Sequence, residues 1–302
     1  MELINLETYI KIIRHIQENK YYNLTLYSIY TFGFILFFKN ISKKTLENKK
    51  YYNIHLGKRC FILGNGPSLN NVEFSTLENE YIFTVNRLML HSEFRKLHSN
   101  YHIWMDPAGF EMEVYLDEMK SLRELGNPIL FVPSYTLDYC KTTGLDTTLN
   151  ISYITALNPR IHSKWIQTDI SKVIPSAINV IHHAIICACY MGFKEIYLLG
   201  CDATLMNDAF KKLLNEQAEP LHCYGTTEEE SHTTTKVIES GSFPESLSCY
   251  TEMFYAYKYI HEYCVMNGIK LVNLSEKTLI DSIPRDKFEN IITQLSSELS
   301  PI

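Results

Sequence analysis

The sequence predicts an α/β fold with a mostly parallel sheet, and two observations indicate it. From residue 57 onward, short apolar segments of strand length alternate with longer segments of helical character. One apolar segment, residues 60–63, ends abruptly in the small, turn-forming run Gly64-Asn65-Gly66-Pro67-Ser68, an arrangement typical of a buried strand in an open sheet. With 302 residues, the chain can bury a large core in one such domain without disulfide bonds.

Six strands are expected from the apolar segments, at residues 60–63, 81–85, 102–105, 129–132, 195–199 and 270–274. Helices are expected at residues 111–125, 176–191, 208–216 and 247–267, the last of which ends before Gly268. Residues 218–244 are polar and rich in Thr and Glu, without a regular period. A long irregular segment inside a compact domain is typical of a functional lid, so we expect a lid over residues 203–246.

Charge and cysteine content narrow the class of protein. The formal net charge of −6 and the pI near 6.0 argue against nucleic-acid binding, which requires a basic surface. The eight cysteines are scattered, mostly in apolar segments, and no two form a C-x-x-C pair. Cys187 and Cys189 are spaced i, i+2, which suits a metal site poorly. We therefore expect reduced core thiols in a cytoplasmic protein, with no bound metal.

The N-terminal segment, residues 1–56, allows two interpretations. Residues 24–38 (LTLYSIYTFGFILFF) are apolar and aromatic, and Lys39, Lys43 and Lys44 follow them. The apolar run is too short to span a bilayer as a helix. Aromatic residues beside lysines are typical of a segment at the membrane surface, here the inner face of the cytoplasmic membrane. The alternative is a helix whose aromatic face packs on the α/β domain or on another subunit.

The turn after residues 60–63 is the first candidate binding site. At the C-terminal end of a buried strand, backbone N–H groups are left unpaired, and open sheets bind ligands there. Gly64 and Gly66 permit a close approach of the backbone, Asn65 offers an amide donor and acceptor, and Pro67 and Ser68 can begin a helix. We expect these five residues to bind a nucleotide phosphate or ribose. A tight structural turn is the alternative, because two glycines fall short of the dinucleotide fingerprint.

A second candidate edge lies further along the chain. Ser176 begins a predicted helix, whose N-terminus carries partial positive charge, and that helix ends at Gly192. The strand that follows, residues 195–199, brings Gly200 and Asp202 to its C-terminal end. We expect Ser176, Gly200 and Asp202 to face a ligand. The alternatives are an ordinary N-cap at Ser176 and a cap on the next helix at Asp202.

Four segments resemble, in the same order along the chain, the bacterial sialyltransferases of glycosyltransferase family 42. They are residues 64–69, 85–87 (Val-Asn-Arg), 175–177 and 192–202. They equally resemble related proteins of capsule and lipopolysaccharide clusters, which include an archaeal hydroxymethylpterin pyrophosphokinase type. The likeness runs from about residue 57 to about residue 280. It implies a single Rossmann-like nucleotide-binding domain of the GT-A-like sialyltransferase type, over residues 57–285, with residues 286–302 as a C-terminal tail. It also implies a CMP-sugar donor used without a metal ion or a resident cofactor.

The resemblance also assigns roles to residues that contact the donor. Asn65 matches the asparagine of the glycine turn, Asn86 the asparagine after the second strand, and Ser176 the serine at a helix N-terminus. Asp106 lies where sialyltransferases carry an asparagine before proline. Each is therefore expected to bind the nucleotide sugar.

His222 matches the lid histidine that acts as general base in that family. A base is needed chemically, because a sugar hydroxyl is a poor nucleophile until its proton is removed, and histidine titrates near neutral pH. His232, in the same polar segment, is the alternative base, and an ordinary loop histidine is the other alternative. Of His182 and His183, within the predicted helix 176–191, we expect one core contact and one surface contact.

The sequence departs from the sialyltransferases just after Asp202. Those enzymes place two tyrosines there to hydrogen-bond the leaving phosphate, whereas residues 203–210 read ATLMNDAF. Tyr224, or Lys211 and Lys212, could supply the contact instead. The departure leaves the identity of the sugar open.

Three functions follow from the sequence. The first is a metal-independent glycosyltransferase that moves sialic acid or a related acid sugar from a CMP-activated donor to a cell-surface glycan or lipid-linked acceptor. The second is a magnesium- and ATP-dependent pyrophosphokinase-like transferase, with Asp106 and Asp202 as metal-binding carboxylates. The third is a non-catalytic partner that binds surface glycans. Homo-oligomers are also expected from the family.

Overall fold

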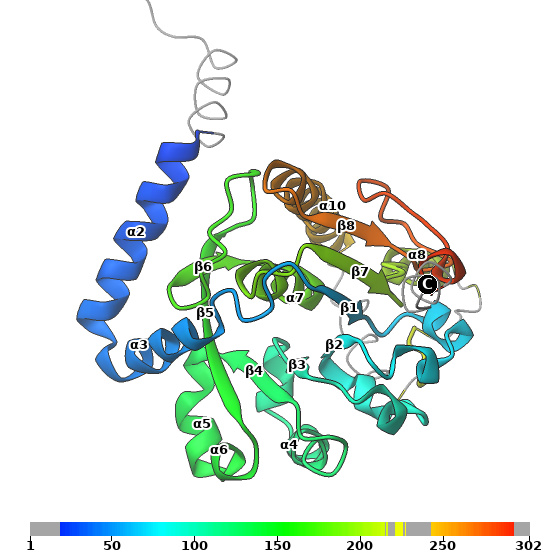
Figure 1. Ribbon diagram of the computed structural model, residues 1–302, viewed down its shortest axis with the longest axis horizontal. Coiled ribbons are helices and arrows are strands. Elements are labelled where there is room, and N and C mark those ends of the chain that lie inside the picture. Colours follow the sequence, from blue (N-terminus) through cyan, green and yellow to red (C-terminus); the bar gives the residue numbers. More distant parts are fainter. Residues whose placement is uncertain (1–18, 215, 217–220, 226, 228–242, 293–302) are drawn as a thin grey trace, which may run out of the picture.

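The computed structural model describes residues 19–214, 216, 221–225, 227 and 243–292. Its centre is one sheet of eight strands, all paired in parallel, in the order β6-β5-β4-β3-β2-β1-β7-β8 (Figure 1). The strands are β1 Arg59–Leu63, β2 Tyr81–Val85, β3 Tyr101–Ile103, β4 Ile129–Pro133, β5 Ile151–Arg160, β6 Val173–Ser176, β7 Glu195–Leu199 and β8 Lys270–Asn273. The predicted α/β class with a parallel sheet is confirmed.

All six strands expected from the sequence are present, although β3 lies one to two residues earlier than predicted. The sequence analysis missed β5 and β6. Each contains a proline, Pro159 or Pro175, and proline within an apolar run normally argues against a strand. Here the two strands lie at one side of the sheet, with β6 at the edge, where a missing N–H donor costs least.

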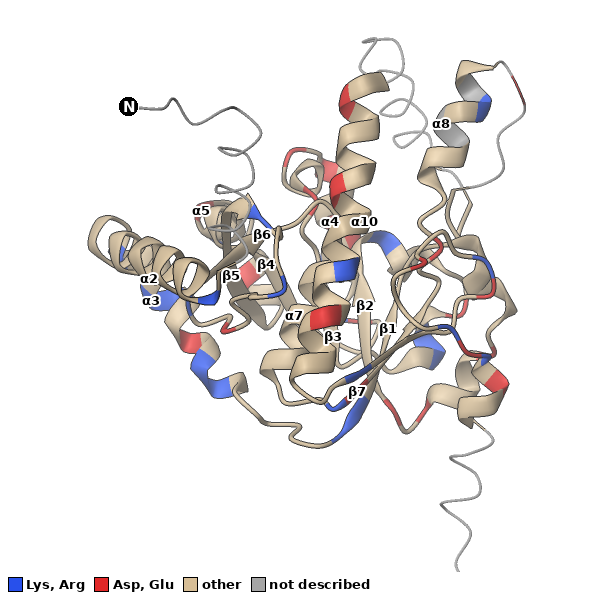
Figure 2. Cartoon of the chain, turned by 90° about the horizontal axis from the view of Figure 1, so that it is seen from above, with Lys and Arg blue, Asp and Glu red and all other residues tan. Residues whose placement is uncertain are grey.

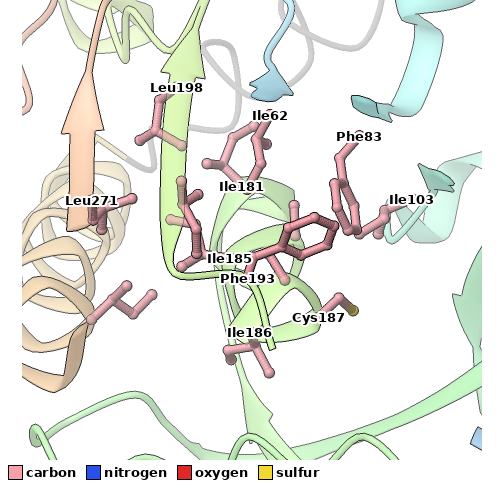
Figure 3. Close-up of a cluster of buried hydrophobic side chains, with 14 of the residues drawn as sticks. Ile62, Phe83, Ile103, Ile181, Ile185, Ile186, Cys187, Phe193, Leu198 and Leu271 are labelled. Carbon is pink, nitrogen blue, oxygen red and sulfur yellow. The ribbon is translucent and has the colours of Figure 1, made fainter. Parts of the chain in front are cut away.

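The strands are buried on both faces, which gives two apolar clusters. In β1, Cys60 and Ile62 belong to one cluster and Phe61 and Leu63 to the other, as the alternating direction of side chains along a strand requires. Figure 3 shows the first cluster, in which isoleucines of helix α7 (Val180–Tyr190) pack among side chains of the strands. Such double burial is why the strands read as continuous apolar runs.

The helices cover both faces and the β6 side of the sheet. Besides α7, they are α2 Lys20–Phe37, α3 Lys39–Leu46, α4 Glu113–Ser121, α5 Leu137–Thr142, α6 Leu145–Thr148, α8 Leu205–Leu213 and α10 Phe243–Met266. Short 3-10 helices connect many elements, namely η1 Glu47–Tyr51, η2 Pro67–Asn71, η3 Phe74–Leu77, η4 Asn86–Leu90, η5 Phe94–Leu97, η6 Pro107–Phe110 and η7 Ser134–Thr136. The helices predicted at 111–125, 208–216 and 247–267 correspond to α4, α8 and α10.

Helix α7 differs from the prediction at its start and in its burial. It begins at Val180 rather than Ser176, because residues 173–176 continue the sheet as β6 and Asn179 provides the N-cap. The expectation that one of His182 and His183 lies on the surface is wrong, since both are buried between the sheet and α10. Burial lowers the pKa of His182 to about 3 and that of His183 to about 4, so both rings are neutral at pH 7.

The topology brings two strand ends together. Strands β1 to β6 follow one another outward in one direction, and the chain then returns to place β7 on the other side of β1. The C-terminal ends of β1 and β7 therefore meet where the strand order reverses. In open α/β sheets this is the position at which ligands bind.

The N-terminal region packs against the side of the sheet formed by β5 and β6. The buried side chain of Asn48, in η1, donates hydrogen bonds to the carbonyl oxygens of Tyr153 (2.8 Å) and Ile170 (3.0 Å). Thr45 shares a hydrogen bond with Thr155 of β5 at 2.8 Å. Residues 39–51 thus contribute to the same core as the sheet. Among the described residues, no helix is long and apolar enough to cross a membrane.

Asn48→Ala tests this attachment. The substitution leaves two buried carbonyl groups without their donor, which costs about 1–3 kcal/mol. We expect the free energy of unfolding, measured by urea denaturation, to fall by about that amount. Asn40→Ala, at an exposed position of α3, is the control and should leave stability unchanged. Equal stability of both variants would contradict the packing described here.

Candidate functional site

A cavity of about 220 Å³ opens at the C-terminal ends of β1, β2 and β7. Seven parts of the chain form it: the three turns after these strands, the N-terminal end of α7, and residues of α8, α10 and the segment 221–222. The lining residues are Gly64, Asn65, Gly66, Val85, Asn86, Ile178, Asn179, Val180, Ile181, Gly200, Cys201, Asp202, Ala203, Thr204, Leu205, Leu221, His222 and Tyr257. Most of this wall is apolar, and its described residues include no lysine or arginine.

The turns after β1 and β7 are tied to each other by their backbones. The N–H of Gly64 donates to the carbonyl of Leu199 and that of Gly66 to the carbonyl of Gly200, each at 2.8 Å. A Cβ on Gly64 would lie 2.5 Å from the Gly200 carbonyl oxygen. The expectation that these strand-end N–H groups are unpaired is therefore wrong for Gly64 and Gly66. Their small size serves the contact between the two turns.

Asp202 closes this junction with its side chain. Its carboxylate accepts a hydrogen bond from the backbone N–H of Ser68 at 2.9 Å and a second one from the Ser68 hydroxyl. Both side chains are buried, and burial raises the pKa of Asp202 against the opposing effect of the Ser68 hydrogen bonds. Asp202 thus caps η2, which begins at Pro67, rather than the helix that follows it. Pro67 and Ser68 do not line the cavity.

Two asparagines that line the cavity have buried, unsatisfied amide oxygens. The Oδ1 atoms of Asn65 and Asn86 are buried, and neither has a hydrogen-bond partner among the residues that the structure describes. Asn86 follows β2 with a φ of 42°, a left-handed conformation that asparagine tolerates better than most residues. A buried amide oxygen without a partner costs free energy. Both positions therefore suit a ligand that donates hydrogen bonds.

The N-terminal end of α7 forms another part of the wall. Asn179 caps the helix by accepting a hydrogen bond from the N–H of Ile181 at 2.9 Å. The sequence analysis placed this role on Ser176, which instead ends β6, donates to Oδ1 of Asn158 and does not line the cavity. Asn179 could have been recognised, because an asparagine directly before an apolar helical run is a strong N-cap signal.

His222 reaches the cavity through a short, anchored segment. The N–H of Cys223 donates to the carbonyl of Asn65 at 2.8 Å, and the N–H of Gly225 donates to the carbonyl of His222. The His222 ring stacks on Tyr224, with centroids 5.0 Å apart. Tyr224 packs towards the second apolar cluster and does not line the cavity. His222 is therefore held beside the Asn65 turn.

Other candidates from the sequence lie elsewhere. Asp106 is exposed and caps η6 by accepting from the N–H of Ala108 at 3.0 Å, outside the cavity. Lys211, in α8, does not line the cavity either. The Lys212 side chain and all of His232 lie outside the described part of the chain, as do 21 of the 44 residues of the predicted lid.

The part of the chain that the structure describes contains no group of three or more His, Cys, Asp or Glu side chains arranged to hold a metal ion. The carboxylates of Asp106 and Asp202 are therefore not gathered into such a group. The eight cysteines are free thiols, and six of them are buried.

A family model described as "6-hydroxymethylpterin diphosphokinase MptE-like" matches residues 34–208, which is more than half of the chain. The chain belongs to this MptE-like family. The matched region begins in the last turn of α2 and ends within α8, so it includes the turns after β1, β2 and β7 that line the cavity. A comparison with the curated proteins gives no match.

Two solved structures are similar to this MptE-like chain. One is the MAf glycosyltransferase from Magnetospirillum magneticum AMB-1, with a TM-score of 0.45 and 12% identity, over 87% of this chain. The chain spans 39% of the length of that protein. The other is the sialyltransferase CstII from Campylobacter jejuni, solved with cytidine-5'-monophosphate. Its TM-score is 0.40 and its identity 15%, over 76% of this chain and 85% of the other.

Gly66→Ala tests the contact between the two turns. The backbone of Gly66 (φ −64°) is one that alanine adopts freely, but a Cβ there would lie 2.4 Å from the Asp202 carboxyl carbon. We expect the free energy of unfolding to fall by about 1–3 kcal/mol, as for other overpacked sites. Gly33→Ala in α2, where a Cβ meets nothing within 4 Å, is the control. A destabilisation by Gly33→Ala as large as that by Gly66→Ala would contradict this.

Asp202→Asn tests the burial of the carboxylate through pH. Folding raises the pKa of this carboxyl above its ordinary value of 3.8. The folded protein therefore loses stability as the pH rises from below 3.8 through the raised pKa, because the buried carboxyl must then give up its proton. Asparagine has no such loss. We expect the stability of the variant relative to the natural protein to increase as the pH rises from about 4 to 7. Urea midpoints measure this, with Asp281→Asn as the exposed control; a constant difference would refute the assignment.

Proposed function

We propose that this protein is a glycosyltransferase that takes a sugar from a CMP-activated donor, in the cavity at the ends of β1, β2 and β7. The acceptor would be a hydroxyl of a cell-surface glycan or of a lipid-linked sugar. The observation that carries this proposal is the pair of buried, unpartnered amide oxygens on Asn65 and Asn86, with His222 on the same wall.

The amides suit the nucleoside part of such a donor. A cytosine amino group and ribose hydroxyls donate hydrogen bonds, which is what the two Oδ1 atoms lack. The surrounding wall of Val85, Ile181 and Leu205 offers an apolar surface for a base or a sugar ring. Binding would then satisfy two polar atoms that are otherwise buried at a cost.

The phosphate would lie near the N-terminal end of α7. No lysine or arginine lines the cavity within the described ranges of the chain, so the positive end of the helix dipole would be the main favourable field for an anion. Asp202 lines the same cavity, and a free carboxylate there would repel a phosphate. Its two hydrogen bonds from Ser68 spread that charge into the protein. The helix end and these hydrogen bonds would together allow CMP to bind without a lysine or arginine from the described lining residues.

His222 would serve as the general base. It would take the proton from the acceptor hydroxyl while the acceptor oxygen bonds to the anomeric carbon, the bond from that carbon to the phosphate breaks, and CMP leaves. Because its segment is hydrogen-bonded to the Asn65 carbonyl, donor binding and base position would be coupled. Such coupling would keep the reactive histidine near a bound donor.

Transfer of a diphosphate from ATP is a second candidate, because the matched family model carries the description of a 6-hydroxymethylpterin diphosphokinase. That reaction would depend on magnesium to neutralise the phosphates. Asp202 would be the carboxylate on the cavity wall that is placed to approach such an ion. The nucleotide and its metal dependence therefore separate the two candidates.

Thermal unfolding with CMP, CDP, UDP, GDP and ATP, each with and without magnesium, tests the proposal. At CMP about 100 times its dissociation constant, we expect the melting temperature to rise by about 5 °C or more without magnesium. Asn65→Ala should weaken CMP about tenfold through the lost hydrogen bond, and exposed Asn150→Ala should not. If the melting temperature rises only with ATP in the presence of magnesium, the result would instead support the diphosphokinase.

His222→Gln separates binding from catalysis. The variant should retain stabilisation by CMP, because the histidine is proposed to act on the acceptor and not on the nucleotide. With CMP-activated acid sugars as donors, turnover should fall by about 10²–10⁴-fold. Unchanged turnover would exclude His222 as the base even if CMP binding is confirmed.

A further inference from the structure

Helix α2 lies at the β6 side of the sheet and extends beyond the body of the domain (Figure 1). It is fixed there by polar contacts of its inner face. The hydroxyl of Tyr27 donates to the carbonyl of Pro159 at 3.0 Å, and the hydroxyl of Thr31 accepts from the N–H of Val173 at 3.2 Å. Asn23 and Tyr27 are the buried residues of the helix. The helix therefore covers the edge strand with one narrow face only.

The remaining surface of α2 is apolar and open. Phe32 is 66% exposed, Phe37 81% and Ile29 61%, values that are unusual for such side chains. The exposed apolar residues recur around one broad face and continue past the helix: Tyr21, Tyr22, Leu24, Ile29, Phe32, Ile35, Leu36, Phe37 and Phe38. A contiguous apolar surface of this kind marks an interaction site.

Positive charge borders this apolar face. Within residues 20–50 there are six lysines and one glutamate, a net charge of +5, whereas the whole chain carries −6 and the rest therefore −11. The lysines lie at the start of α2, on α3 and on η1, and Figure 2 shows those on α3 beside the nearly uncharged α2. Lys39, Lys43 and Lys49 are exposed. The Lys20 ammonium lies 5.4 Å from the Trp165 ring, which adds an aromatic to the same end.

We propose that α2 and α3 bind the surface of a membrane that contains anionic lipids. The apolar face of α2 would enter the boundary between headgroups and acyl chains, with the lysines at the level of the lipid phosphates. Aromatic and aliphatic residues beside lysines fit that region chemically. The helix would lie in the plane of the surface, because it is not long and apolar enough to cross a bilayer. This inference does not depend on the proposed reaction.

The charge distribution favours a lipid surface over a second copy of the chain. In a two-fold dimer the same patch meets itself, so the lysines of α3 would approach those of the partner. Only Glu47 offers an opposite charge within residues 20–50, and it already pairs with Lys44 of its own chain at 3.1 Å. Anionic headgroups supply the missing negative charge, and each lysine near such a surface increases binding about fivefold.

Co-sedimentation of the full chain with vesicles tests the proposal. We expect binding to phosphatidylglycerol-containing vesicles that weakens with salt, and much weaker binding to phosphatidylcholine alone. Phe32→Ser with Leu36→Ser should reduce binding at least tenfold by removing apolar area. Lys39→Gln with Lys43→Gln and Lys49→Gln should reduce binding to the anionic vesicles about 100-fold. Val114→Ser, at an exposed apolar position of α4, is the matched control and should bind normally.

Melting temperatures of the variants, measured without lipid, establish that each is folded. Absence of binding by the natural protein, or binding that neither set of substitutions weakens, would overturn the proposal. Sedimentation velocity tests the alternative that this face binds a second copy of the chain. A stable dimer that dissociates when Phe32→Ser and Leu36→Ser are introduced would identify the face as a subunit interface. No nucleotide is present in these measurements. A negative result would therefore overturn the membrane proposal without bearing on the proposed reaction.

Discussion

The close approach of the turns after β1 and β7 is the constraint on which the site depends. Two adjacent parallel strands end together at the reversal of strand order, and their turns are joined by backbone hydrogen bonds of Gly64 and Gly66. Only residues without a Cβ allow this separation. The carboxylate of Asp202 then fills the space beside Gly66 and binds Ser68. The result is one hydrogen-bonded wall of the cavity, formed by the backbone of the two turns and one buried carboxylate.

The rest of the cavity lining comes from elements that meet this wall. Asn86 follows the neighbouring strand β2, Asn179 begins α7, and Cys223 attaches its segment to the Asn65 carbonyl. Each of these elements is held by the sheet or by the β1 turn. A displacement of the β1 turn would therefore move Asn65 and the His222 segment together. Two of the buried polar atoms that remain unsatisfied, Oδ1 of Asn65 and Oδ1 of Asn86, belong to residues at which these elements converge.

The two regions of proposed interaction lie on different parts of the fold and use different chemistry. The cavity offers amides, a helix N-terminus and a histidine in an apolar wall, with little positive charge. Helices α2 and α3 offer an exposed apolar face bordered by lysines. An enzyme that acts on lipid-linked or surface glycans would benefit from both, since attachment raises the local concentration of enzyme near such an acceptor. The lysines of residues 20–50 do not line the cavity.

The sequence by itself predicted the α/β class, six of the eight strands and four residues of the strand-end turns that line the cavity, and the family resemblance added others. The first group is Gly64, Gly66, Gly200 and Asp202, and the resemblance pointed to Asn65, Asn86 and His222. Strand periodicity and turn residues are local properties, so they can be read without coordinates. The tertiary structure decided what local patterns leave undetermined. It showed that Ser68 binds Asp202 across 134 positions of the chain, that Ser176 ends a strand, and that both His182 and His183 are buried. Tyr257 lines the cavity because α10 packs against α7 in the folded chain. These outcomes depend on contacts between distant segments, which hydrophobic pattern and capping preference do not encode.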